Sequence, residues 1–153
     1  MKVEARLQEL GIQLPTPGKP MANYVGCTQD GNILYLSGHG PFKDGKAAFK
    51  GKLGKEITLE EGYQAARLCA IGHLGVLKAK LGDLDKVDQV LKLLAFVSSA
   101  NGFDQQPAVV NGASDLLVEV FGDRGRHARS AIGTSQLPLD IPVEIEMIVR
   151  VRD

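Results

Sequence analysis

The spacing of apolar residues predicts two long helices in this chain of 153 residues. After Thr58, apolar or small side chains recur every three or four positions as far as about Leu81, which is the period of an α-helix. Thr58 and Glu61 form a capping box, and Gly82 follows the last periodic residue, so both ends of this helix are marked. Pro107 fits the first turn of a second helix with a similar apolar stripe.

Alternating and uniformly apolar segments predict the strands. The predicted strands are residues 24–29, 33–37, 87–97, 130–136 and 142–151. Asp30-Gly31 suits a tight turn between the first two strands, because glycine readily adopts a positive φ. The last two strands are predicted to form a hairpin built around Pro138 and Pro142, and the Lys- and Gly-rich segment 43–54 is expected to be a surface loop.

The order of these elements indicates the fold class. Two strands, a helix, a strand, a helix and two strands predict an α+β domain with a mixed sheet and two long helices. The whole chain, residues 1–153, is expected to form one domain. Residues 1–20 form an N-terminal extension with a short amphipathic helix at 3–10 and a Pro-rich connector.

Two strand segments are apolar on both of their faces. These are Ile33-Leu34-Tyr35-Leu36 and Leu93-Leu94-Ala95-Phe96-Val97. Such strands are buried on both sides of a sheet, whereas two helices cover only one side. A second copy of the chain covering the other side would avoid a large exposed apolar patch. The sequence therefore predicts a homo-oligomer.

The charge, hydropathy and cysteine spacing of the chain argue against several classes of function and location. The formal net charge is zero, with 18 basic and 18 acidic residues, and this balance argues against a nucleic-acid partner. No apolar run is long enough to cross a membrane, and the early charges do not fit a secretory signal, so cytoplasm is the expected location. Cys27 and Cys69 have no metal or redox spacing, and each is expected to be a free, buried thiol.

Arg129 and Glu144 are the candidate catalytic residues. An arginine can hold a carboxylate through two parallel hydrogen bonds, and the small neighbours of Arg129 leave room for a ligand. A glutamate close to it can polarise a water molecule. The alternative is that Arg129 forms a structural ion pair and Glu144 is a solvated acid. If the two side chains meet, they suggest hydrolysis of a small carboxylated molecule.

Other residues are weaker candidates. Tyr24 can donate a hydrogen bond into a pocket, although tyrosine is common in strands for packing alone and its position favours that role. Ser37 and Gly38 end a strand where backbone groups can approach a ligand, and Asn111 lies near the start of the second helix. His39, His73 and His127 lack ligand spacing, so no metal site is expected, and no Gly-x-Ser-x-Gly motif indicates a serine hydrolase.

Four motifs resemble one known family. They are Gly-Asn-Ile-Leu-Tyr-Leu-Ser-Gly at 31–38, Val-Asn at 110–111, Ala-Arg-Ser at 128–130 and Val-Glu-Ile-Glu at 143–146. With the Leu-Pro turn at 137–138 between the last two, the chain resembles a longer subgroup of the RidA/YjgF family from about Tyr24 to its end.

The resemblance implies a chorismate-mutase-like fold of the bacillus type, with two long helices on one face of a mixed sheet, and a homotrimer with clefts between subunits. It also implies cofactor-free hydrolysis of reactive 2-imino or enamine acids to 2-ketoacids and ammonia. By position, Arg129 matches the carboxylate-binding arginine and Glu144 the acid that positions water. The cleft-lining positions are Tyr24, Ser37, Gly38, Asn111 and Ala131.

Departures from the short family pattern leave alternatives open. The extension at 1–20, the 43–54 loop and the longer segment between Asn101 and Asn111 border the expected cleft. One alternative is a non-enzymatic protein that binds a small carboxylate. Another is an endoribonuclease, which the zero net charge and the lack of a His/Lys constellation for phosphodiester chemistry disfavour.

Overall fold

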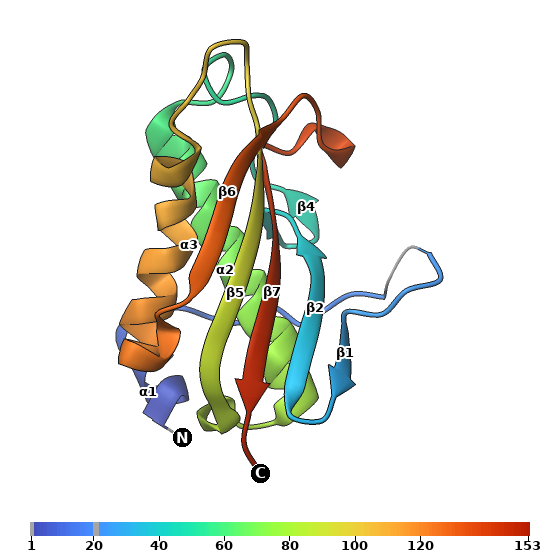
Figure 1. Ribbon diagram of the computed structural model, residues 1–153, viewed down its shortest axis with the longest axis vertical. Helices are drawn as coiled ribbons and strands as arrows, with labels where there is room; N and C mark the ends of the chain where they lie inside the picture. The colour runs from blue at the N-terminus through green and yellow to red at the C-terminus, as the bar shows by residue number, and fades with distance from the viewer. Residues whose placement is uncertain (1, 20–21) are drawn as a thin grey trace.

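The computed structural model describes residues 2–19 and 22–153 (Figure 1). The helices and strands are α1 (Lys2–Glu9), β1 (Cys27–Asp30), β2 (Ile33–His39), β3 (Phe42–Lys43), β4 (Lys46–Ala47), α2 (Leu59–Leu81), β5 (Val87–Ser98), α3 (Gln106–Phe121), β6 (Ala128–Thr134) and β7 (Val143–Val151). Single 3-10 turns lie at Leu84–Lys86, Gly122–Gly125 and Pro138–Asp140.

One mixed sheet organises the molecule, with the strand order β1-β2-β7-β5-β6. All neighbouring pairs are antiparallel except β5 and β6, which are parallel. Figure 1 shows α2 and α3 on the same face of this sheet. The predicted α+β class, with two long helices on one face of a mixed sheet, is confirmed.

Helix α2 begins and ends where its sequence predicts. The Thr58 hydroxyl accepts the Glu61 backbone N–H at 3.1 Å, and the Glu61 carboxylate accepts the Thr58 N–H at 3.0 Å. This capping box satisfies two of the N–H groups that a helix start leaves unpaired. At the other end Gly82 has a φ of 77° and donates its N–H to Lys78 O, which closes the helix.

The first hairpin is present, but its details differ from the prediction. Strand β1 starts at Cys27 and not at Tyr24, and the turn residues are Gly31 and Asn32 instead of Asp30 and Gly31. Asp30 pairs with Ile33, so the two residues between them form the loop, and Gly31 supplies the positive φ of 60°.

The predicted hairpin between residues 130–136 and 142–151 is wrong, because β5 lies between β6 and β7. Helix α3 carries the chain from the end of β5 back to the start of β6, so these two strands run parallel as in a βαβ unit. Strand β7 then pairs with the other edge of β5.

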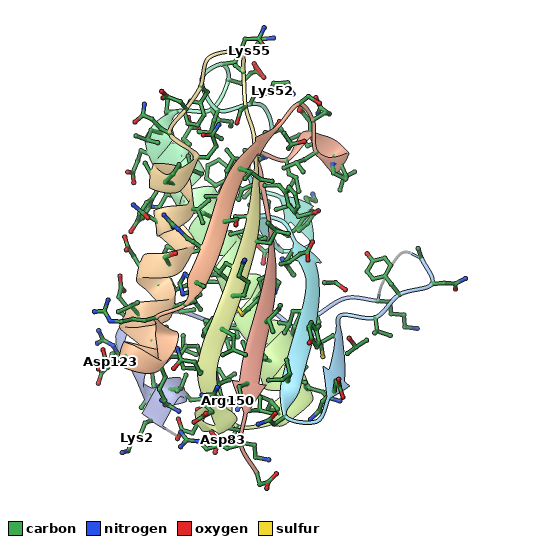
Figure 2. The ribbon with its side chains drawn as sticks, in the orientation of Figure 1. Lys2, Lys52, Lys55, Asp83, Asp123 and Arg150 are labelled. Carbon is green, nitrogen blue, oxygen red and sulfur yellow. The ribbon has the colours of Figure 1, made fainter. Side chains whose placement is uncertain are left out.

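The segment 43–54 is more than a surface loop. It contains the short β3–β4 hairpin, and Leu53 is fully buried in the core. Lys52 donates hydrogen bonds to Gln136 Oε1 at 2.8 Å, to Ser98 Oγ at 3.3 Å and to the Ser135 carbonyl. Figure 2 shows Lys52 at the end of the molecule far from Asp83 and Arg150. The segment is therefore fastened to the end of β5 and to the loop that follows β6.

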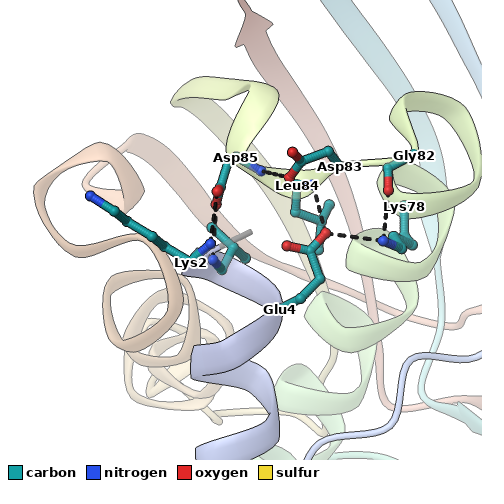
Figure 3. A network of polar contacts seen from close by, with 8 residues as sticks. Lys2, Glu4, Lys78, Gly82, Asp83, Leu84 and Asp85 are labelled. Carbon is teal, nitrogen blue, oxygen red and sulfur yellow. Dashed lines mark hydrogen bonds and ion pairs between the residues drawn. The ribbon is translucent and has the colours of Figure 1, made fainter.

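A polar network fastens α1 to the opposite end (Figure 3). Glu4 accepts hydrogen bonds from Lys78 Nζ at 3.1 Å and from the Leu84 N–H at 2.9 Å. Asp85 accepts the backbone N–H groups of Lys2 and Val3 at the start of α1, at 2.7 and 2.9 Å. A carboxylate at this position also complements the dipole of the helix. The predicted short helix is confirmed, and it packs through buried Val3 and Leu7.

The face of the sheet opposite the helices is uncovered by any described residue. Tyr35 and Ile132 lie on it and are 47% and 45% exposed. Half-buried Leu94, Phe96 and Ile148 share this face according to the strand register. Their neighbours along each strand, such as Leu93 and Ala95, are fully buried under the helices. Among the described residues no helix is long and apolar enough to span a membrane.

Helices α2 and α3 touch through their backbones at Gly112. A Cβ placed on Gly112 would lie 1.9 Å from the Tyr63 carbonyl oxygen, so only glycine allows this approach. We expect Gly112→Ala to push the helices apart and to lower the free energy of unfolding by about 2 kcal/mol, as overpacking does. Urea denaturation measures the change. Gly18→Ala is the control, because a Cβ there meets no atom within 4 Å. Equal stability of both variants would contradict this account of the helix contact.

Candidate functional site

Arg129 lies on β6 and its side chain reaches α3. Its Nη1 donates to the Ser114 hydroxyl at 3.0 Å, and its Nη2 donates to the Pro107 carbonyl at 3.2 Å. Both acceptors are uncharged, and no carboxylate within residues 2–19 and 22–153 forms an ion pair with Arg129. The predicted alternative of a structural ion pair is therefore wrong for the described residues, and the cation retains three N–H donors.

Two other predicted site residues lie beside Arg129. Ala131 is two positions further along β6, so it shares the face of Arg129 that points toward α3. Asn111 is exposed on α3, one helical turn from both Pro107 and Ser114. We call Arg129, Ala131, Asn111 and the two acceptors of Arg129 the arginine half-site.

Glu144 lies on β7 beside a bulge in β2. Leu36 pairs with Met147 and His39 pairs with Ile145, so Ser37 and Gly38 together face a single residue of β7. A Cβ on Gly38 would be 3.0 Å from the carboxyl carbon of Glu144. Because Gly38 has no side chain, the Glu144 carboxyl can lie against the β2 backbone.

The segment before β1 adds Tyr24 to this second group. The Ser37 hydroxyl donates to the Val25 carbonyl at 2.6 Å and holds the segment against the bulge. Tyr24, Ser37 and Gly38 line a common cavity of about 240 Å³. The Tyr24 residue is 55% exposed. We call Tyr24, Ser37, Gly38 and Glu144 the glutamate half-site.

The environment of Glu144 favours its protonated form. Burial raises the pKa of the Glu144 carboxyl above its ordinary value, and the nearby charge of Glu146 raises it further. A carboxylate with a raised pKa is a stronger base than an exposed one. Glu144 is therefore suited to accept a proton from a water molecule and to return it in a later step.

The two half-sites do not meet within one chain. Arg129 is opposite Leu93 of β5, and Glu144 is opposite Phe96 on the other edge of the same strand. Two strand spacings and three residues along the strand separate their backbones by about 14 Å. Arg129 also points toward α3, whereas Glu144 points to the uncovered face. The predicted proximity of the pair through a hairpin is wrong within the chain.

Ser114, one of the two acceptors of Arg129, and His127, which contacts Ser114, were not predicted as site residues. Ser114 Oγ lies 2.8 Å from Nε2 of His127, and Nδ1 of His127 lies 2.6 Å from the Gly125 carbonyl. The period of two along an extended chain places His127 on the same side as Arg129, which is a signal available from sequence. The contact with Ser114 was not available, because it depends on how α3 packs against β6.

The remaining histidines and cysteines are not members of either half-site, although His39 lines the cavity beside Ser37 and Gly38. His73 is buried in α2 beneath His39, and burial lowers the pKa of His73 to about 3, with a smaller contribution from His39. A Cβ on Gly72 would be 2.2 Å from the His39 ring, so glycine makes room for that ring on the helix. Cys69 is a buried, free thiol as predicted, whereas free Cys27 is only half-buried.

Within the described residues, one group of three side chains has the spacing of metal ligands. It consists of Glu4, Asp83 and Asp85, whose oxygens lie within 4.8 Å of one another. These carboxylates accept backbone N–H groups, and Glu4 also accepts a hydrogen bond from Lys78. Their contacts are those of the network that holds α1 (Figure 3), and none of the three belongs to either half-site.

Sequence comparison identifies the family. Residues 4–149 match the family described as "YjgF/chorismate mutase-like, putative endoribonuclease". The chain is also 44% identical to protein TCP17 of Trypanosoma cruzi over 153 residues, which cover 99% of this chain and 96% of that one. The chain therefore belongs to the YjgF family, as its motifs predict.

Solved structures agree with this assignment. The protein Atu1372 of Agrobacterium tumefaciens is 45% identical with a TM-score of 0.93, and the match covers 98% of this chain and 92% of that one. A Shewanella oneidensis protein described under the endoribonuclease name is 31% identical with a TM-score of 0.95, over 99% and 100% of the two chains. The fold is thus the chorismate-mutase-like fold of this family.

The pKa shift of Glu144 has a consequence for stability. Because the pKa is raised in the folded chain, ionisation of Glu144 opposes folding once the pH rises above the ordinary value of 4.5. We expect Glu144→Gln to be more resistant to urea than the wild type at pH 7, with the difference shrinking at pH 4. Glu119→Gln, at an exposed position of α3, is the control. A wild type that is more stable than Glu144→Gln at pH 7 would contradict the assignment.

Proposed function

We propose that the protein hydrolyses reactive 2-imino or enamine acids to 2-ketoacids and ammonia, at clefts between the subunits of a homotrimer. One observation carries this proposal: the arginine half-site, whose cation no described carboxylate neutralises, and the glutamate half-site, whose carboxyl has a raised pKa, lie at different places on the chain. Neither half contains both an anion-binding cation and a water-activating acid. A second copy of the chain can bring its glutamate half-site to the arginine half-site of the first.

The arginine half-site supports a carboxylate-bearing substrate. The acceptors that hold Arg129 are a hydroxyl and a carbonyl, so its positive charge is not neutralised. Its free N–H groups can form a bidentate pair with a carboxylate, which is among the stronger interactions available to a protein. Asn111 offers a polar side chain beside that pair, and the small side chain of Ala131 leaves space for the rest of the substrate.

The glutamate half-site supports the hydrolytic step. Glu144 accepts a proton from water as the water oxygen bonds to the imine carbon and the C=N π electrons move to nitrogen. Glu144 then returns its proton to the nitrogen, and the C–N bond breaks with its electron pair going to nitrogen, so that ammonia leaves. The former water oxygen loses its second proton to the Glu144 carboxylate and becomes the ketone oxygen. A protonated imine is already electrophilic, so orientation of the substrate and one placed water provide much of the acceleration.

The uncovered face of the sheet supports the oligomer. Tyr35, Leu94, Phe96, Ile132 and Ile148 form an apolar surface on it, which soluble monomers rarely leave exposed. Glu144 and Glu146 lie on the same face. A closed ring of three copies would cover the apolar residues and bring Glu144 to the subunit boundary.

The activity is tested in a coupled reaction. Threonine dehydratase generates 2-iminobutanoate, and the protein is expected to accelerate release of 2-ketobutyrate in the presence of an amine that traps the imine. Arg129→Ala should lower kcat/KM by about 100-fold, because the charged hydrogen bonds to the carboxylate are lost. Arg126→Ala removes an exposed cation nearby and should leave the rate unchanged. Equal rates for Arg129→Ala and the wild type would refute the proposal.

Mixed oligomers test the division of the site between subunits. Arg129→Ala and Glu144→Gln chains carry different affinity tags, are produced together and are purified through both tags. Each variant alone should be inactive. Every mixed trimer contains a single complete site out of three, so about one third of the wild-type activity should return. No recovered activity in mixed trimers would show that one chain supplies both residues or that the assembly is different.

A further inference from the structure

A continuous chain of hydrogen bonds runs through the arginine half-site. It passes from Arg129 Nη1 to Ser114 Oγ at 3.0 Å, from there to His127 Nε2 at 2.8 Å, and from His127 Nδ1 to the Gly125 carbonyl at 2.6 Å. Its members come from β6, α3, the approach to β6 and the turn Gly122–Gly125. All four groups are thus fixed by different parts of the fold.

The chemistry of the end groups fixes the direction of every bond. A carbonyl oxygen only accepts, so Nδ1 of His127 must carry a proton. Burial lowers the pKa of His127, the hydrogen bond to the Gly125 carbonyl raises it, and the Arg129 charge lowers it. The net shift is below the ordinary value of 6.5, so the ring is neutral near pH 7 and Nε2 has a lone pair. The Ser114 hydroxyl must then donate to Nε2, and its oxygen lone pairs face Arg129, which can only donate.

We propose that Ser114 and His127 are positioning residues for the carboxylate-binding guanidinium of Arg129. His127 orients the Ser114 hydroxyl, and the hydroxyl together with the Pro107 carbonyl holds the two terminal nitrogens of the guanidinium at fixed positions. This inference rests on the proposed function, because it concerns the same half-site. Neither residue needs to touch the substrate.

Neutral acceptors suit this role better than carboxylates. An Asp or Glu at position 114 would hold the guanidinium equally well, but it would neutralise the charge that attracts the ligand. The hydroxyl and the carbonyl leave the net charge intact and use two of the five N–H groups. Fixing the long arginine side chain before binding also removes an entropy cost of ordering it when the carboxylate arrives.

The direction of these hydrogen bonds predicts a measurable protonation state for the His127 ring. In long-range ¹H–¹⁵N spectra of the full oligomer at pH 7, with His127 assigned by comparison with His127→Gln, the ring should carry its proton on Nδ1. The other tautomer, or a doubly protonated ring, would overturn the inferred direction of the hydrogen bonds.

The effect on the ligand is tested with 2-ketobutyrate, whose binding is measured by calorimetry. Ser114→Ala should weaken binding about 10-fold, the loss expected for an interaction worth about 1.4 kcal/mol. Ser114→Thr retains the hydroxyl and should bind as the wild type does. Ser135→Ala removes a serine hydroxyl from an exposed loop and is the matched control. In the Arg129→Ala background, Ser114→Ala should add no further loss, because it acts through Arg129.

Measurements of turnover distinguish a failure of this inference from a failure of the proposed function. Ser114→Ala should raise KM for 2-iminobutanoate about 10-fold and leave kcat nearly unchanged, as removal of uniform binding does. If Arg129→Ala weakens 2-ketobutyrate binding and Ser114→Ala does not, the positioning role is overturned and the carboxylate site stands. If both weaken binding and the wild type has no turnover, the positioning role is supported and the deaminase activity is overturned. If neither weakens binding, both proposals fail.

Discussion

Strand β5 separates Arg129 from Glu144, because it pairs with β6 along one edge and with β7 along the other. Arg129 and Glu144 are close in sequence, and a hairpin would have made them neighbours. The β5–α3–β6 crossover instead places a buried strand between them. A parallel connection of this kind needs a helix to return the chain, and α3 is that helix. The same helix supplies both acceptors that hold the Arg129 side chain.

The proposed assembly of several copies would explain both the uncovered face of the sheet and the separation of the two half-sites. The helices bury one side of β5 and β7 completely, whereas Phe96, Ile132 and Glu144 remain on the other side. An interface formed there would exclude water from apolar residues and would further desolvate Glu144. Desolvation is already the main cause of its raised pKa in the single chain. Assembly and activation of the acid would then be one event.

Local signals in the sequence predicted most of the elements, and long-range contacts explain what they missed. The capping box at Thr58 and Glu61 and the glycine at 82 involve residues a few positions apart, so they fix α2 without knowledge of the fold. The partner of β6 depends on which strands meet after the whole chain has folded, and adjacent strands joined by prolines favoured a hairpin. The contact between Ser114 and His127 was not predicted for the same reason, because it requires α3 to lie against β6. The family motifs identified the two half-site groups by residue but not their separation.

The close contact between Gly72 and His39 restricts how related sequences can diverge. A methyl group at position 72 would overlap the imidazole ring, which itself lines the cavity beside Ser37 and Gly38. Positions 39 and 72 therefore cannot change independently without cost. An alanine at position 72 requires a residue smaller than histidine at position 39. A later return to histidine at position 39 requires glycine at position 72 first. Homologues should show these two positions covarying, and the order of the two substitutions along a lineage is constrained by the space between one helix and one bulge.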